Sequence, residues 1–233
     1  MDRRALLLGP LPALVLVGCG AAALPEQASG DDAPLPSSTL ATDSPSAPAP
    51  ETPITVPLSL YLMQDAADAA DAAGSSLSSQ RSEDGLTLIG QNMGEVWAQA
   101  NVIFDPITVA TIAAPTDVLE AIALGLDTSR FFDQIGATFD VPDPSAVNGF
   151  YVRTAGRVNG FAPIGSRVFF VIDEPSVHDE RVSSHEVGHI FGLHHQLEDP
   201  GTLMFSGTNG TVLTEDEIVV ARYVAQGVLD GVR

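Results

Sequence analysis

Apolar residues gather along the chain in short runs that predict about five β-strands. The runs occupy residues 54–63, 107–114, 149–155, 160–165 and 167–173, and the last is apolar enough to be buried on both faces. Pro163 has no amide hydrogen to donate, so the run that holds it is expected at an edge of the sheet. These runs predict a sheet with an edge strand near residue 163.

Other segments show the apolar spacing or the end signals of helices. One stripe at helical spacing consists of Leu86, Ile89, Met93, Val96, Trp97 and Ala100. A final helix is predicted from residue 214 to about residue 229, because Thr214 and Glu217 form a capping box at its start. Residues 115–148 hold a short helical pattern and a Pro/Asp-rich loop, from which no chemistry follows.

Residues 1–18 have the pattern of an export signal. Two arginines precede a mostly apolar run, residues 5–17, that is too short to span a membrane stably. The letters LVGC, residues 16–19, resemble the lipobox of bacterial lipoproteins, in which the signal is cut before the cysteine and the cysteine is lipidated. The resemblance implies a lipid on Cys19 and a membrane-anchored protein on the extracytoplasmic side of the cell envelope. The alternative is an ordinary signal peptide and a secreted form.

The signal is followed by a segment without the composition of a folded domain. Residues 19–53 are rich in Ala, Pro and Ser and contain no aromatic residue. Such a segment cannot bury enough apolar area to offset its ordering entropy, so a disordered tether is expected. The folded domain is then expected over residues 54–233. It contains no cysteine, so its core must stabilise it without disulfides.

The charge balance is strongly acidic, with 30 acidic residues against 10 basic ones, all of them arginine. A negative surface repels phosphate backbones, so no nucleic-acid partner is expected. No further apolar run approaches about 20 residues, so no transmembrane helix is expected. A monomer is the favoured oligomeric state.

Four of the five histidines lie within residues 183–195, which read SSHEVGHIFGLHH. On a helix, His185 and His189 leave the same face one turn apart, where two neutral imidazoles suit one tetrahedral Zn²⁺. Glu186 lies beside the first histidine, where it can reach a water at the metal without completing the coordination shell. An amphipathic helix with incidental histidines is the alternative interpretation.

A third metal ligand is expected from the turn after this helix. Gly192 can take a left-handed conformation that ends the helix and turns the chain sharply. His195 can then swing back to the metal, whereas the adjacent His194 has the wrong register after the glycine. Three protein ligands and one water are typical of a catalytic zinc site.

The run HEVGHIFGLHH resembles the motif H-E-x-x-H-x-x-G-x-x-H of the metzincin metalloproteases, and Met204 in GTLMF follows where that family has its Met-turn. The resemblance implies an α+β, zincin-like domain over residues 54–233. Its twisted mixed sheet of about five strands would have an antiparallel edge strand, followed by the motif helix and a C-terminal helix. The predicted elements occur in that order. The resemblance also implies one catalytic Zn²⁺ on the three histidines, with Met204 as a hydrophobic base beneath them.

The chain departs from the metzincins at three points. Some members have a tyrosine two residues after the methionine, where this chain has Ser206. Matrixins bind a structural zinc through upstream histidines, but only His178 lies upstream here, and we interpret it as a loop or helix-start residue. A cysteine-based latency is not expected, because no cysteine is available for it. The subfamily therefore stays unassigned.

Two sets of acidic residues are candidates for binding calcium. Asp65, Asp68 and Asp71 are spaced three apart, and Asp173 and Glu174 end the run predicted to be a buried strand. The alternative for the first set is a solvated helix face or a loop. The alternative for the second set is a solvated strand end.

These observations lead us to expect a zinc-dependent endopeptidase that hydrolyses peptide bonds of extracytoplasmic proteins or peptides. Glu186 would act as general base on the water at the zinc. An extended substrate would pair by strand addition with the edge residues Phe161, Ala162, Pro163 and Ile164. Two alternatives stay open: a catalytically inactive zinc-binding or adhesion lipoprotein, and a zinc hydrolase that acts on a non-protein amide.

Overall fold

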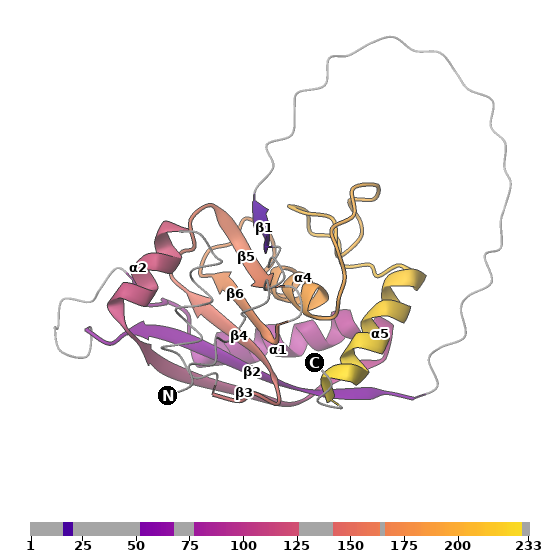
Figure 1. Cartoon of the computed structure of the whole chain (residues 1–233), viewed down its shortest axis with the longest axis horizontal. Coiled ribbons are helices and arrows are strands. Elements are labelled where there is room, and N and C mark those ends of the chain that lie inside the picture. The colour runs from indigo at the N-terminus through magenta and orange to yellow at the C-terminus, as the bar shows by residue number, and fades with distance from the viewer. Residues whose placement is uncertain (1–15, 21–51, 68–76, 126–141, 164–165, 230–233) are drawn as a thin grey trace, which may run out of the picture.

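The computed structural model describes residues 16–20, 52–67, 77–125, 142–163 and 166–229. Within these ranges one sheet of six strands has the order β1-β5-β6-β4-β2-β3 (Figure 1). The strands are β1 (Leu16–Gly20), β2 (Ile54–Asp65), β3 (Val102–Ala114), β4 (Val147–Val152), β5 (Val158–Pro163) and β6 (Val168–Ile172). The α-helices are α1 (Glu83–Trp97), α2 (Thr116–Leu124), α4 (Asp179–Ile190) and α5 (Glu215–Leu229), and a short 3₁₀ helix covers Ala98–Ala100.

The sheet is mixed, as predicted. Strands β3, β2, β4 and β6 are parallel neighbours, and β5 runs antiparallel to β6. The five apolar runs correspond to β2 through β6, which confirms the α+β fold with an antiparallel strand beside a parallel sheet. Residues 16–20 have no strand prediction, yet they form β1 and pair antiparallel with the outer edge of β5. Without β1, the strand that ends at Pro163 would be the edge of the sheet.

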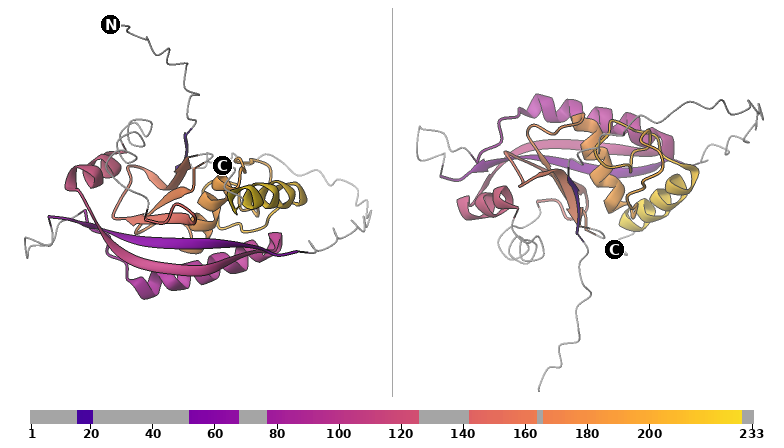
Figure 2. Two further views of the ribbon diagram at one scale, coloured as in Figure 1. Left: turned by 60° about the horizontal axis from the view of Figure 1, so that its bottom comes forward. Right: turned by 90° about the horizontal axis from the view of Figure 1, so that it is seen from above.

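Helices cover both faces of the sheet, and each face has its own core. The alternating side chains of β2 divide between them: Leu58 and Leu60 pack with α1, α4 and α5, whereas Tyr61 and Met63 pack with α2. Figure 2 shows α1 and α2 on opposite sides of the sheet. This period-two division is the reason that the strand has apolar residues at nearly every position. The first of these cores lies directly under α4.

Two helix starts follow from local sequence. Ser82 accepts a hydrogen bond from the Gly85 amide at 3.1 Å and begins α1. The capping box predicted for the final helix is confirmed, because the Thr214 amide donates to Glu217 at 2.7 Å and the Glu217 amide donates to the Thr214 hydroxyl at 3.2 Å. None of the helices in the described ranges is long and apolar enough to cross a membrane.

Candidate metal centre

Helix α4 carries the first two histidines through the interior of the protein. Every residue from Arg181 to Ile190 is buried. The helix begins after His178, which is exposed and whose backbone amide donates to the Asn209 side chain at 2.8 Å. His178 is therefore the helix-start residue that the sequence indicates, and it lies outside the histidine cluster.

The turn after α4 has the conformation that the sequence predicts. Gly192 has a φ of +84°, in the left-handed region that glycine adopts without strain. A Cβ atom at this position would also approach a Val224 methyl carbon of α5 to 3.2 Å. The chain turns here, and His195 comes back to the two histidines of the helix.

Three imidazoles converge at one point. The Nε2 atom of His195 lies 3.1 Å from Nε2 of His185 and 3.2 Å from Nε2 of His189. Two nitrogens that bind one tetrahedral zinc at about 2.0–2.1 Å lie about 3.3 Å apart, so the observed separations suit a shared zinc ion. The structure therefore brings together the three residues that the motif singles out.

Backbone carbonyls hold the other nitrogen of two of these rings. Nδ1 of His185 lies 2.6 Å from the Leu203 carbonyl oxygen, and Nδ1 of His189 lies 2.9 Å from the Leu193 carbonyl oxygen. A carbonyl can only accept a hydrogen bond, so each Nδ1 carries the proton and each Nε2 keeps its lone pair. Metal-binding histidines are commonly oriented in this way.

Burial keeps the three rings neutral. It lowers the pKa of His185 well below the ordinary value, and the positive charge of Arg181 adds to this effect. Burial likewise lowers the pKa of His189 to about 4 and lowers the pKa of His195. Near pH 7 each imidazole is therefore uncharged and has one nitrogen free of a proton, which is the form that binds metal.

Glu186 is fully buried and lies against β5. A Cβ atom on Gly160 would lie 3.0 Å from both Cγ and Oε1 of Glu186, and 2.8 Å from the Phe170 carbonyl oxygen. Only a residue without a side chain leaves this space for the carboxylate. Glu186 of α4 therefore packs closely against the antiparallel strand β5.

Met204 lies against the helix that carries the first two histidines. It is fully buried, and a Cβ atom on Gly188 would lie 2.5 Å from its sulfur. Gly188 therefore lets the methionine approach the helix backbone between His185 and His189. This contact explains a glycine that costs a helix interior up to about 1 kcal/mol relative to alanine.

His194 does not join the cluster. Its side chain is exposed, and within the described residues the group that could hold a metal consists of His185, His189 and His195. The choice of His195 over its neighbour therefore agrees with the geometry.

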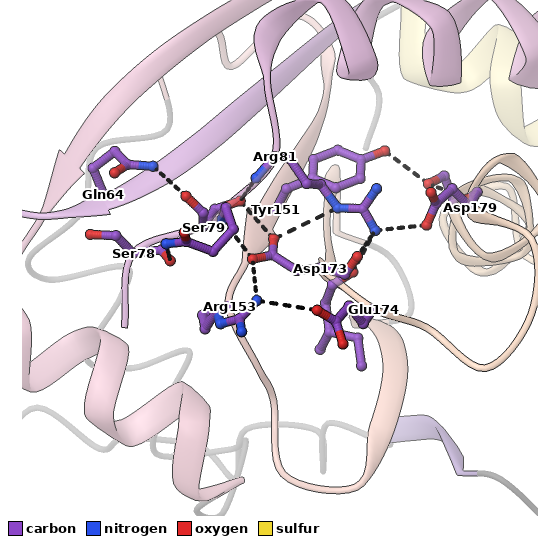
Figure 3. Close-up of polar contacts among 12 residues, drawn as sticks. Gln64, Ser78, Ser79, Arg81, Tyr151, Arg153, Asp173, Glu174 and Asp179 are labelled. Carbon is purple, nitrogen blue, oxygen red and sulfur yellow. Dashed lines mark hydrogen bonds and ion pairs between the residues drawn. The ribbon is translucent and has the colours of Figure 1, made fainter. Parts of the chain in front are cut away.

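The end of β6 differs from the expected solvated strand end. The Asp173 side chain is only 3% exposed and accepts hydrogen bonds from the Ser79 hydroxyl at 2.6 Å and the Gln80 amide at 2.7 Å. Figure 3 shows this carboxylate between the guanidinium groups of Arg81 and Arg153. The interpretation as a solvated end is wrong for Asp173, because two arginines and polar groups of the 79–80 segment enclose it.

The other acidic candidates do not form a metal cluster where they are described. Asp65 is buried and accepts hydrogen bonds from the Thr116 hydroxyl at 2.6 Å and the Ala67 amide at 2.9 Å, so it organises its own loop. Asp68 and Asp71 lie outside the described residues. Glu174 is 85% exposed and lies 3.6 Å from Arg153.

Sequence reasoning does not identify two residues that shape this centre. Gly160 lies in a run recognised only as a strand, and its contact with Glu186 depends on tertiary packing. Arg181 lies four residues before His185, on the same helix face, and this spacing is the signal that could have drawn attention to it.

The fold is similar to that of metalloproteinase-II from Bacteroides fragilis, with a TM-score of 0.50 and 13% sequence identity. The alignment covers 75% of this chain and 55% of that chain, so this chain spans about half the length of that protein. A chain from a chaperone–substrate complex aligns with a TM-score of 0.40 and 13% identity, over 76% of this chain and 35% of that chain. No protein-family model and no curated protein matches the sequence. The likeness to the metalloproteinase shows a shared fold and nothing beyond it.

Proposed function

We propose that this protein is a zinc-dependent endopeptidase. The observation that carries the proposal is the convergence of three histidine Nε2 atoms at one point, on a helix that also carries the fully buried Glu186. Three neutral nitrogens leave the fourth tetrahedral position of a zinc ion to water or substrate, which is the arrangement of catalytic rather than structural zinc sites. His185, His189 and His195 would hold the ion.

The chemistry divides between the metal and the protein. Zinc bound here would supply Lewis acidity and lower the pKa of a water molecule. Glu186 would accept a proton from the attacking water and then deliver it to the departing amine. The Leu203 and Leu193 carbonyls would keep the rings of His185 and His189 oriented during the reaction.

Strand β5 is the proposed docking edge for an extended peptide. In the structure this edge pairs antiparallel with the chain's own β1, with Gly18 opposite Phe161, Val17 opposite Ala162 and Leu16 opposite Pro163. A peptide in the same place would pass the position of Gly160, which contacts Glu186. An edge that accepts an extended strand beside the general base favours peptides over small esters as substrates.

The edge residues would contact a peptide mainly through their backbone. The side chains of Phe161 and Ala162 are buried, and Phe161 stacks on Phe170 with ring centroids 4.8 Å apart. Ile164, the fourth residue predicted for this role, lies outside the described residues. Backbone pairing supplies affinity without sequence preference, so preference must come from other walls of the site.

We also propose that the protein is anchored on the extracytoplasmic side of the cell envelope through a lipid on Cys19. This proposal rests on the lipobox-like run LVGC at residues 16–19. Its substrates would then be extracytoplasmic proteins or peptides. A zinc-binding lipoprotein without turnover and a zinc hydrolase of a non-protein amide are the competing proposals.

The test is cleavage of a random peptide library by the wild-type domain, residues 54–233, and by its Glu186→Ala variant, both loaded with zinc. We expect the wild type to cleave and the variant to lose at least about 100-fold of that rate, since general base catalysis is worth about 10²–10⁴-fold. Zinc binding by both proteins with cleavage by neither would instead support a binding protein or a non-peptide substrate.

A further inference from the structure

Arg181 is a buried cation inside the motif helix, one turn before His185. Arg181 is only 2% exposed, which is unusual for an arginine. Nη2 donates to the Leu203 carbonyl at 2.8 Å and also to the Phe205 carbonyl, and Nε donates to the Gly210 carbonyl at 3.3 Å. One guanidinium thus holds three backbone positions of the segment that follows the third histidine.

One of these carbonyls is shared with the metal centre. The Leu203 oxygen accepts from Arg181 Nη2 at 2.8 Å and from His185 Nδ1 at 2.6 Å. A carbonyl oxygen has two lone pairs and can serve both donors. The next residue is Met204, which lies against Gly188 of the same helix. Arg181 therefore connects to the centre through the hydrogen bond of the first histidine and through the position of the methionine.

We propose that Arg181 is a positioning residue of the metal centre. It fixes the Leu203 carbonyl where this oxygen orients His185, and it clamps residues 203–210 to α4. This inference rests on the proposed zinc site. The planar guanidinium suits the task because it presents several donors in a fixed fork, whereas a lysine ammonium is a point charge that cannot reproduce that geometry.

A purely structural role is the competing explanation, and the chain contains a matched control for it. Arg222 also donates to backbone carbonyls, to Ala100 at 2.6 Å and to Thr52 at 2.7 Å. Neither partner belongs to the metal centre. Replacing Arg222 should therefore lower stability without changing how the histidines bind a metal.

The experiment compares the full-length wild type with Arg181→Lys and Arg222→Lys. Lysine keeps the positive charge, so electrostatic repulsion of the metal stays nearly constant and only the fork geometry is lost. Zinc affinity is measured by competition with a chelator, and the ligand geometry is measured from the visible absorption bands of the Co²⁺-loaded proteins. Thermal unfolding of the metal-free proteins reports stability separately.

We expect Arg181→Lys to bind zinc about tenfold more weakly, as loss of an outer-shell partner typically does, and to show altered Co²⁺ bands. Arg222→Lys should match the wild type in both. If Arg181→Lys does not yield folded protein, Arg181→Gln keeps one amide donor and should show altered Co²⁺ bands, because these bands report ligand geometry rather than the lost charge. Wild-type affinity and Co²⁺ bands in a folded Arg181 variant would overturn the inference and leave the zinc site standing. A wild type that binds neither metal would overturn both.

Discussion

At the scale of single residues, small side chains decide how closely the parts of the centre approach one another. Gly160 leaves space for the Glu186 carboxylate, and Gly188 leaves space for the Met204 sulfur. At both glycines a methyl group would come too close to neighbouring atoms. The metal centre therefore depends on two absent side chains as much as on the histidines themselves.

The contact between Gly188 and Met204 gives the first prediction. In Gly188→Ala the new methyl carbon would lie 2.5 Å from the methionine sulfur in a fully buried place. Overpacking of this kind costs about 1–3 kcal/mol, while the gain in helix propensity is at most about 1 kcal/mol. We expect a lower free energy of unfolding for the metal-free protein in urea and weaker zinc binding.

Gly94→Ala is the matched control for this substitution. Gly94 also lies inside a helix, α1, but a Cβ atom there would meet nothing within 4 Å. The Gly94→Ala substitution should therefore raise the free energy of unfolding by about 0.5–1 kcal/mol. Equal effects of the two substitutions would show that Gly188 contributes only helix propensity.

The sequence predicts the positions of metal-centre residues that are close together along the chain. The spacing of His185 and His189 on a helix and the turn at Gly192 place His195 correctly, because backbone geometry over eleven residues is nearly fixed by hydrogen bonding and by one left-handed glycine. The partners of Glu186 and Arg181 could not be foreseen. They come from β5 and from the segment after the third histidine, and no local pattern encodes such distant contacts.

At the scale of elements, β5 connects the sheet to the metal centre. One edge of β5 pairs with β6 and the other pairs with β1, so in the uncleaved chain β1 covers the proposed docking edge. Cleavage before Cys19, which the lipobox-like run implies, would remove residues 16–18 and open that edge. The apolar run at residues 160–165 predicted β5, and Pro163 predicted that it lies at an edge, but β1 takes the edge position in the structure. The pairing of residues 16–20 could not be predicted, because register between distant segments depends on an exposed edge being available rather than on local propensity.

Removal of β1 gives a prediction at this scale. A chain that begins at Ala21 lacks β1 and should leave the edge of β5 open to substrate. We expect kcat/KM for peptide cleavage to rise above that of the full-length chain, mainly through a lower KM. Initial rates over a range of peptide concentrations measure this.

A chain that begins at Ile54 separates β1 from the segment that follows it. It also lacks β1, so its kinetic constants should equal those of the chain that begins at Ala21. Equal KM values for all three chains would contradict the idea that β1 and the substrate share one edge.

At the scale of the whole molecule, an ion-pair network centred on the buried Asp173 and Arg81 side chains joins the elements around the site. Arg81 precedes α1 and binds Asp179 at the start of α4 at 2.6 Å, while its guanidinium also donates to the carbonyls of Ile172 and Asp173 at 2.8 and 2.6 Å (Figure 3). The network thus fixes the end of β6 and the start of the motif helix relative to one another. The order of the strands and helices could be predicted from the sequence. The Arg81 contacts that connect the end of β6 to the start of α4 could not.

Arg81→Met tests the network. The Asp173 side chain is 3% exposed, so removal of a charged partner leaves a buried carboxylate with less compensation. We expect a loss of about 3 kcal/mol in the free energy of unfolding, measured in urea at neutral pH. The control is Arg153→Met, whose side chain is 36% exposed and whose loss should cost less than about 1 kcal/mol. A cost for Arg153→Met as large as that for Arg81→Met would contradict this account.

The most direct test of the central claim is the zinc content of the purified full-length protein, measured by elemental mass spectrometry. We expect one tightly bound zinc per chain in the wild type and in Glu186→Ala, and none in a folded His189→Ala variant. His194→Ala, which changes the exposed neighbour of the third ligand, should keep its zinc. A folded wild type without zinc affinity, or a His189→Ala variant that retains the ion, would contradict the proposed centre.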